Sequence, residues 1–346
     1  MSGAVSAADA VLVLSFGGPE GPDEVMPFLD NVLAGRDVPQ ERKLAVAEHY
    51  HHFGGVSPIN AGNRELVAAL RAELSTAGLD LPVYWGNRNW HPMLADTVAS
   101  MREDGVRRAL VFATSAFGSY SGCRQYRQDL AAATAAAPGT PTLDKLRLFY
   151  DHPGFVAAAA DGLRAALAGG DPADVVLFSA HSIPTAMADG SPYVSQLRVA
   201  AGLVAQRCGV EDWELVFQSR SGPPGQPWLE PDIGDRLRRQ PPGSTVVVCP
   251  IGFVSDHMEV VWDLDTEAAA LAADLGVGFR RAATAGTHPE FVSMIRRLVE
   301  ERLDERAPRL GLDPAGSWPD RCPDGCCPAA ERPVPRPSGA AAGARP

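Results

Sequence analysis

Short runs of apolar residues, many of them β-branched or aromatic, alternate with amphipathic stretches along most of the chain. The pattern predicts eight strands, at residues 10–16, 82–86, 108–115, 146–150, 174–180, 214–219, 245–250 and 277–282. The stretches between them carry helical periodicity, and such alternation is typical of parallel sheets covered by helices on both faces. Because the runs fall into two successive sets, we expect an α/β protein of two similar lobes, each a parallel sheet of about four strands flanked by helices.

The sequence AGGDP at residues 168–172 interrupts the helical periodicity and marks a boundary between the lobes. We therefore divide the chain into an N-terminal lobe at 1–169, a C-terminal lobe at 170–306 and an extension at 307–346. The extension contains the cysteine-bearing sequence RCPDGCCP. It ends in a low-complexity stretch rich in proline, alanine and glycine, a composition that favours disorder.

Composition narrows the class of protein. The chain has 346 residues and a formal net charge of −11, whereas a general nucleic-acid-binding protein needs a basic face. No apolar run approaches the ~20 residues that span a bilayer, and the N-terminus lacks the pattern of a signal peptide. We therefore expect a cytoplasmic protein that binds no nucleic acid and has no integral membrane segment. Its six cysteines then argue against a disulfide framework.

Three acidic residues recur at four-residue spacing within SDHMEVVWDLDTE, and we call Glu259, Asp263 and Glu267 the acidic row. On a helix they form one edge beside an aliphatic edge, with successive acids about 6 Å apart along the axis. A hydrated divalent ion could pass from one acid to the next, and local π-helical widening would align them further. The alternative is an ordinary solvated helix face that begins with a capping box of Asp256 and Glu259.

A second polar motif, FSAHSIP, places His181 directly after the strand predicted at 174–180. The acidic row likewise follows the strand predicted at 245–250, and ligands of open α/β sheets gather beyond the carboxyl ends of the strands. Imidazole and carboxylate suit Fe²⁺ or Zn²⁺, and neutral imidazole also accepts protons near pH 7. The alternative is a loop histidine bonded to the backbone, and the residues alone favour neither interpretation.

Seven stretches occur in the order seen in ferrochelatases: VLVLSFGGPE, FGGVSPIN, YWGNRNWHP, TSAFGSYSGCRQY, FSAHSIP, FQSRSGP and PIGFVSDHMEVVWDLDTE. The chain resembles this family over about residues 10–305. The resemblance implies two Rossmann-like lobes, with a porphyrin bound in the cleft between them and Fe²⁺ inserted into its ring. It gives His181 and Glu259 the catalytic and metal-binding roles, and it makes Asp263 and Glu267 further acids of a metal or proton path.

The resemblance also implies porphyrin contacts in the first lobe, at Ser57, Tyr126 and Tyr50. Arg88 ends a predicted strand, where a buried arginine would orient a carboxylate or hold the site in shape. Phe16 stands where many Gram-positive members have a tyrosine that ligates heme iron. Phenylalanine cannot form that bond, so we expect Phe16 to line the porphyrin site without binding the metal.

Four cysteines form a further candidate site. Cys322, Cys326 and Cys327 lie in the extension, and Cys123 lies in SYSGCRQY. The resemblance implies that these thiolates hold a [2Fe–2S] cluster, as in some members of the family. Their spacing alone leaves a Cys₄ zinc site or a redox-labile tail open.

The region AEHYHHFGG, residues 47–55, is polar where an enzyme that takes protoporphyrin from a membrane would need an apolar lip. We therefore expect coproporphyrin III, a soluble tetracarboxylate, and Fe²⁺ as substrates, with coproheme as product. Transient contact with the preceding and following enzymes of heme biosynthesis would complete the set of partners. A protoporphyrin IX ferrochelatase, and a non-catalytic tetrapyrrole or metal carrier on the same fold, are the alternatives.

Overall fold

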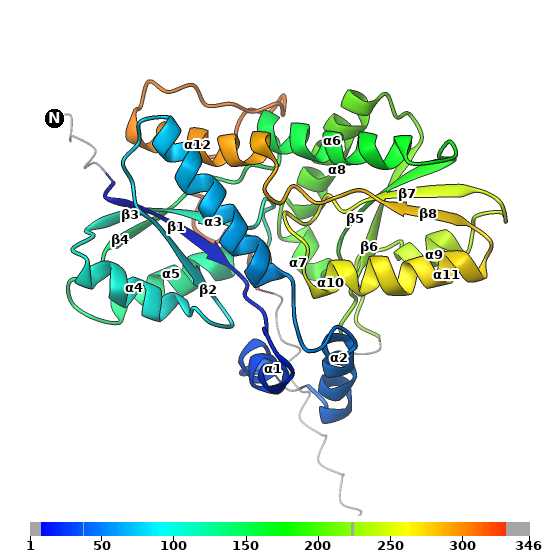
Figure 1. The fold of residues 1–346 in the computed structure, drawn as a ribbon, viewed down its shortest axis with the longest axis horizontal. Coiled ribbons are helices and arrows are strands. Elements are labelled where there is room, and N and C mark those ends of the chain that lie inside the picture. Colours follow the sequence, from blue (N-terminus) through cyan, green and yellow to red (C-terminus); the bar gives the residue numbers. More distant parts are fainter. Residues whose placement is uncertain (1–7, 37, 223–224, 330–346) are drawn as a thin grey trace, which may run out of the picture.

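Two parallel sheets of four strands organise the chain in its computed structural model, which describes residues 8–36, 38–222 and 225–329 (Figure 1). The first sheet has the order β2-β1-β3-β4 and contains β1 (Ala10–Ser15), β2 (Val83–Asn87), β3 (Arg108–Ala113) and β4 (Thr142–Lys145). The second has the order β6-β5-β7-β8 and contains β5 (Val175–His181), β6 (Trp213–Gln218), β7 (Thr245–Cys249) and β8 (Gly278–Arg281). The two sheets repeat one topology, which confirms the predicted pair of parallel α/β lobes.

The strand predicted at 146–150 is wrong, because β4 ends before it. The N–H of Leu146 still donates to the main chain of β3 at 2.8 Å, but the chain then leaves the sheet. The next apolar residues are at most 2% exposed: Leu148, Phe149 and Tyr150. Their apolar character reflects burial in a connection rather than pairing in a sheet, and a short apolar run does not distinguish the two.

Helices cover both sheets. The first sheet packs against α3 (Ile59–Thr76), α4 (Leu94–Glu103) and α5 (Gln125–Ala135), and the second against α8 (Tyr193–Cys208), α9 (Ile233–Leu237) and α11 (Ala269–Asp274). Their apolar residues meet strands that are buried along most of their length, as expected for parallel sheets.

The last helix of each half crosses to the other half. Helix α6 (Pro153–Ala168) packs against β7, β8 and α8, whereas α12 (Pro289–Leu303) returns to α3 and β3 (Figure 1). The ring of Phe291 in α12 lies 6.0 Å from that of Phe112 in β3. One apolar core therefore continues through both lobes. The predicted lobe boundaries, at 169/170 and 306/307, stay predictions.

Several short elements lie around the lobes. In the first half, η1 (Pro22–Glu24), α1 (Val25–Leu33) and α2 (Gln40–His52) follow β1, and α1 and α2 stand apart from the sheets (Figure 1). In the second half, α7 (Thr185–Asp189) follows β5 and α10 (Met258–Val261) follows β7. Two π-helices complete the set, η2 (Tyr120–Arg124) and η3 (Asp263–Ala268).

The extension after α12 runs back along the first lobe. Arg147 and Glu301 form an ion pair at 2.7 Å, with side chains 1% and 2% exposed. The same guanidinium donates to the main-chain O of Leu310 at 2.7 Å and so holds the extension against the body of the protein. The terminal stretch predicted to be disordered lies outside the described residues. Of the helices that the structure describes, none combines the length and apolarity needed to cross a membrane.

Candidate active site

Strands β5 and β7 are neighbours in the second sheet, and their carboxyl ends bring His181 next to Glu259. His181 is the last residue of β5, and Glu259 lies in the first turn of α10, after the loop that follows β7. Nδ1 of His181 lies 3.1 Å from Oε2 of Glu259. His257 fixes the main chain here, because its Nδ1 accepts a hydrogen bond from the N–H of Glu259 at 3.2 Å. The structure therefore places the two predicted catalytic residues in direct contact.

Each member of this pair sets the charge of the other. Burial would lower the pKa of His181, but the Glu259 carboxylate outweighs burial and raises that pKa above its ordinary value. Burial would raise the pKa of Glu259, but His181 outweighs it and lowers that pKa to about 2. The two side chains remain 29% and 46% exposed, so a reactant can reach both. The pair can therefore hold a proton on the imidazole beside an ionised carboxylate.

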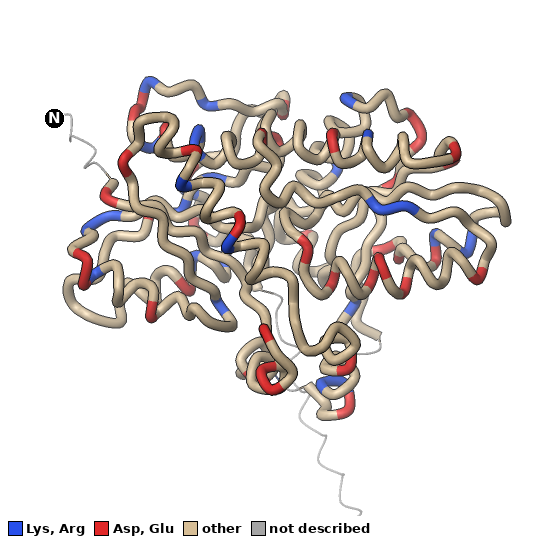
Figure 2. The backbone as a smooth tube through the Cα atoms, in the orientation of Figure 1, with Lys and Arg blue, Asp and Glu red and all other residues tan. Residues whose placement is uncertain are grey.

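The acidic row continues from Glu259 into η3, in a segment where acidic residues gather (Figure 2). The N–H of Glu267 donates to the O of Trp262 at 2.9 Å, an i→i+5 bond, so the π-helical widening expected from the sequence is present. Burial, aided by the charges of Glu259 and Glu267, raises the pKa of Asp263 to about 7, although a hydrogen bond from Ser219 opposes the shift. Asp263 therefore exchanges a proton near neutral pH while Glu259 stays ionised.

Two residues at the end of β6, Gln218 and Ser219, belong to this site and were not predicted. Gln218 is 1% exposed, and its side-chain amide donates to the main-chain O of Glu259 at 2.7 Å. Ser219 has a φ of 63°, which is uncommon for a residue with a side chain, and its hydroxyl donates to Oδ2 of Asp263. The available signal was their place at the carboxyl end of the strand predicted at 214–219, the same edge of the sheet at which His181 was expected.

Helix α2 brings residues of the first lobe against this site. The ring of His49 stacks on that of Trp262, with centroids 4.2 Å apart and planes inclined by 11°. Burial raises the pKa of Tyr50, and the negative charge of Glu259 raises it further, so the phenol lies within electrostatic reach of the carboxylate. Among the predicted porphyrin contacts, Tyr50 is therefore the residue whose raised pKa indicates that it lies near Glu259.

The other predicted porphyrin contacts lie in the first lobe and differ in exposure. Phe16 is 37% exposed, whereas Ser57 is only 3% exposed. Arg88 pairs with Asp129, and its guanidinium carbon lies 4.5 Å from the ring centroid of Tyr126. The charge of Arg88 is therefore engaged by a carboxylate of the protein, which favours the expected shaping role over direct binding of a substrate carboxylate. The porphyrin-binding roles of these residues stay predictions.

The predicted cluster cysteines come together where the extension meets the first lobe. A hydrogen bond with Cys123 lowers the pKa of Cys322 to about 5, and the Sγ atoms of Cys326 and Cys327 lie 3.4 Å apart. Arg124 fixes this part of the extension by donating to the main-chain O of Cys326 at 2.9 Å. Within residues 8–36, 38–222 and 225–329, however, no group of three or more His, Cys, Asp or Glu side chains is arranged to hold a metal ion.

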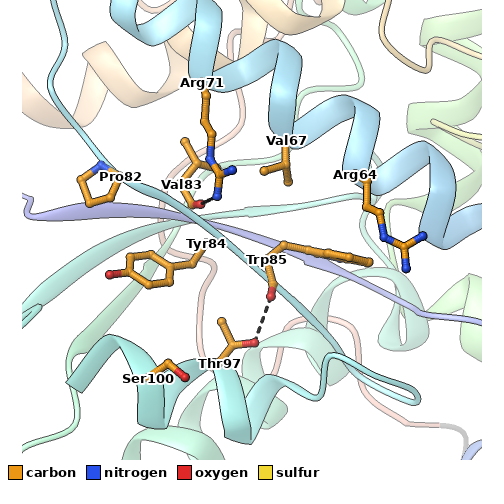
Figure 3. A pocket seen from close by; sticks show the side chains of 9 residues that line it. All are labelled: Arg64, Val67, Arg71, Pro82, Val83, Tyr84, Trp85, Thr97 and Ser100. Atoms are coloured by element: carbon orange, nitrogen blue, oxygen red, sulfur yellow. Dashed lines mark hydrogen bonds between the residues drawn. The ribbon is translucent and has the colours of Figure 1, made fainter. Parts of the chain in front are cut away.

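A cavity of about 670 Å³ lies away from these groups, at the outer edge of β2 between α3 and α4 (Figure 3). Two arginines of α3 line it, and both have partners within the protein. Arg64 pairs with Glu20 at 2.6 Å, and Arg71 donates to the main-chain O of Val83 at 2.6 Å. The predicted site residues are not among those that line this cavity, so it takes no part in the chemistry considered below.

A sequence profile described as Ferrochelatase matches residues 8–303, nearly the whole described chain. The chain belongs to the ferrochelatase family. It is 54% identical to "Ferrochelatase" of Rhodopirellula baltica, over 92% of this chain and 93% of the relative. It is also 54% identical to "Coproporphyrin III ferrochelatase" of Nocardia farcinica (95% and 99% of the two chains) and 53% identical to the protein of that name from Streptomyces coelicolor (96% of each).

Solved structures with the same fold are more distant from this ferrochelatase-family protein in sequence. SirB from Bacillus subtilis with Fe³⁺ has a TM-score of 0.53 and 13% identity, covering 88% of this chain and 99% of that one. CbiX, described as the terminal enzyme of siroheme biosynthesis in denitrifying bacteria, has a TM-score of 0.51 and 16% identity, covering 85% and 100%. These similarities confirm the chelatase-like fold predicted from the sequence.

The raised pKa of Asp263 predicts a pH-dependent effect of its substitution. In the folded state this pKa is about 7 against an ordinary value of 3.8, so the folded protein binds the extra proton and loses stability as pH rises through 7. Asp263→Asn removes that loss. We expect the free energy of unfolding at pH 8 to rise by about 1–3 kcal/mol, with the gain shrinking toward pH 4. Urea unfolding at several pH values measures both.

Asp274→Asn, at an exposed carboxyl near the end of α11, is the matched control, and it should change the free energy of unfolding by less than ~0.5 kcal/mol at each pH. An Asp263→Asn effect of equal size at pH 8 and pH 4 would contradict the raised pKa.

Proposed function

We propose that this protein inserts Fe²⁺ into coproporphyrin III and forms coproheme. The observation that carries the proposal is the contact of His181 with Glu259 at 3.1 Å, at the carboxyl ends of adjacent parallel strands. The family supplies the reaction class, and the relatives in Nocardia and Streptomyces bear the name of the coproporphyrin III enzyme. The two substrates are then a planar tetracarboxylate and a ferrous ion.

Metal insertion exchanges two pyrrole protons for one Fe²⁺, so the site must accept two protons in succession. In this proposal, the neutral imidazole of His181 takes the first proton, and the adjacent Glu259 stabilises the imidazolium that forms. Glu259 keeps its negative charge because of this pairing, and that charge also attracts the incoming ferrous ion. Base and metal ligand thus act from one face of the ring.

The acidic row removes the first proton from the His181–Glu259 pair, so that His181 becomes neutral again. With a pKa of about 7, Asp263 can take the proton from the His181–Glu259 pair and release it toward Glu267 and solvent. The pair is then ready for the second pyrrole proton. Ser219 and Gln218 hold Asp263 and Glu259 in place during this transfer, because each donates a hydrogen bond to one of them.

In this proposal the first lobe forms the opposite wall of the site. The negative charge of Glu259 acts on the Tyr50 phenol, which indicates that the two side chains are near each other. The partly exposed ring of Phe16 offers an apolar surface for a flat macrocycle. Phe16 has no atom that ligates iron, so the product would lack an axial bond on that side. Ser57 contributes to the same wall, whereas Arg88 and Tyr126 support it through their contact with each other.

We also propose that Cys123, Cys322, Cys326 and Cys327 hold a [2Fe–2S] cluster. The contacts among these thiols and the lowered pKa of Cys322 support the proposal, since thiolates are the ligands such a cluster requires. Burial raises the pKa of Cys326 and Cys327, so binding of the cluster would have to deprotonate these thiols and bring the described side chains closer to a common centre. When bound, the cluster would tie the extension to the first lobe. Free thiols and a ferrous substrate both suit a reducing cytoplasm, which we propose as the location.

Substitution of His181 tests the proposed chemistry. His181→Ala should lower kcat for iron insertion by about 10²–10⁴-fold, the usual contribution of a positioned base, with the porphyrin Kd changed less than about three-fold. Anaerobic absorbance assays with Fe²⁺ and fluorescence titration with coproporphyrin III measure the two quantities. His288→Ala, at the N-cap of α12, is a matched histidine control and should leave kcat within about two-fold. Near-normal turnover by His181→Ala would exclude the assigned role.

The choice of porphyrin has its own test. We expect kcat/KM for coproporphyrin III to exceed that for protoporphyrin IX by at least ten-fold, because the sequence of the region 47–55 is mostly polar, although Phe53 within it is 37% exposed. Parallel anaerobic assays with both porphyrins measure the ratio. A preference for protoporphyrin IX would overturn the substrate assignment, and porphyrin binding without insertion of iron would indicate a carrier.

The cluster proposal predicts a spectroscopic change. Wild-type protein purified without oxygen should contain about two iron atoms per chain and show the visible absorption of a [2Fe–2S] centre. Cys123→Ser should lose both, whereas Cys208→Ser, at a cysteine outside the group, should retain both. Stoichiometric zinc with no visible absorption in the wild-type protein would favour a Cys₄ zinc site instead.

A further inference from the structure

Tyr193, in the first turn of α8, holds the main chain of His181. Its hydroxyl donates to the carbonyl O of His181 at 3.0 Å, and the residue is only 7% exposed. Burial raises the pKa of Tyr193, and the charge of Glu259 raises it further, so the phenol keeps its proton and remains a donor. On the other side, the N–H of Ser182 donates to the O of Gln218 at 2.8 Å. The end of β5 is thus held between β6 and Tyr193.

The start of α8 also contacts the cysteine-bearing extension. A methyl group placed on Gly190, just before this helix, would lie 3.1 Å from Cγ of Pro328. Pro328 directly follows Cys327, one of the four convergent cysteines. The extension therefore reaches the turn between α7 and α8, which directly precedes the helix that carries Tyr193.

The segment that leads to Cys123 contacts the same part of α8. The N–H of Gly118 donates to Oε1 of Gln196 at 2.7 Å, and the ring of Phe117 lies 6.3 Å from that of Tyr193. Ser119 then caps η2, the π-helix that contains Cys123. Of the two cysteine-bearing segments, the one that leads to Cys123 therefore contacts the first turn of α8, and the extension lies against the turn that precedes it.

We propose that Tyr193 is a positioning residue for His181, and that the four-cysteine region influences metal insertion through it. This inference rests on the proposed function, in which His181 accepts the pyrrole protons. The cysteine region fixes the first turn of α8, and that turn directs the Tyr193 hydroxyl to the carbonyl of His181. A misplaced imidazole slows the chemical step but leaves porphyrin binding, which the first lobe provides, nearly unchanged.

Tyr193→Phe tests whether Tyr193 positions His181, because the substitution removes the hydroxyl and keeps the ring. We expect kcat to fall about ten-fold or more with KM for the porphyrin within about two-fold, and amide exchange to rise at Ser182. Tyr84→Phe is the matched control: its hydroxyl donates to Asp104 at 2.7 Å, away from His181, and kcat should not change. Wild-type kcat and exchange in Tyr193→Phe would overturn the assignment.

Gly190→Ala tests whether the four-cysteine region influences metal insertion through Tyr193. The φ of Gly190 is −84°, which alanine adopts without strain, so the added methyl acts mainly on Pro328. We expect about three-fold lower kcat and faster amide exchange in residues 322–327 and 185–193. In the Tyr193→Phe background, Gly190→Ala should change kcat little, because the route is already broken. Gly62→Ala, where the methyl would have nothing within 4 Å, is the control.

Additive effects of the two substitutions on kcat would overturn the coupling, as would unchanged exchange in residues 185–193 of Gly190→Ala. The exchange measurements separate this inference from the proposed function. If the wild-type protein inserted no iron, the proposed function would fail, while exchange at Ser182 and in residues 185–193 would still show whether the extension and Tyr193 hold the end of β5.

Discussion

The contact between His181 and Glu259 is the interaction on which the site depends. It exists because β5 and β7 are parallel neighbours, so the residues that follow them meet at one edge of the sheet. The strand on the other side of β5 completes the arrangement, since β6 ends in Gln218 and Ser219. Three segments that are separate in the sequence thus contact one another at this edge of the sheet, and none of them could form the site alone.

That arrangement gives two nearby carboxyl groups opposite properties. Both Glu259 and Asp263 are partly buried, which by itself favours the neutral acid. Glu259 has a direct imidazole partner and stays ionised, whereas Asp263 lies between two other acids, whose charges together with burial outweigh the Ser219 hydrogen bond and the smaller opposing effect of His181. One group is therefore suited to attract a cation and the other to pass protons near pH 7. Asp263 is held beside the end of β6 by the hydrogen bond from the Ser219 hydroxyl.

The sequence was sufficient to predict the residues that combine an unusual side chain with a position after a strand. His181 and the acidic row met that condition, and the structure brings His181, Glu259 and Asp263 together. Ser219 did not meet that condition, because it was the last residue of the strand predicted at 214–219 and serine is a common residue there. Its left-handed backbone is visible only in the fold. Tyr193 was beyond reach, because its partner is a main-chain carbonyl and no side-chain pattern encodes that contact. The strand predicted at 146–150 lies instead at Thr142–Lys145. The sequence could not show this, because burial in a connection and pairing in a sheet favour the same apolar residues.

The repeated topology shows why the two lobes have different tasks. By their order in the sheets, β1 and β2 correspond to β5 and β6, so Ser15 and Asn87 occupy the places of His181 and Gln218. Ser15 and Asn87 are fully buried, and the side chain of Asn87 donates to Asn60 and to a main-chain carbonyl. The first lobe therefore ends both strands in neutral groups with partners inside the protein, whereas in the second lobe β5 ends in the ionisable His181 beside the neutral Gln218. A flat ligand held between the lobes would meet the His181–Glu259 pair on the side of the second lobe. Because α6 and α12 are exchanged between the halves, one shared core fixes both walls relative to each other. That rigidity is what a site needs if it is to hold a planar ring at a fixed distance from a single imidazole.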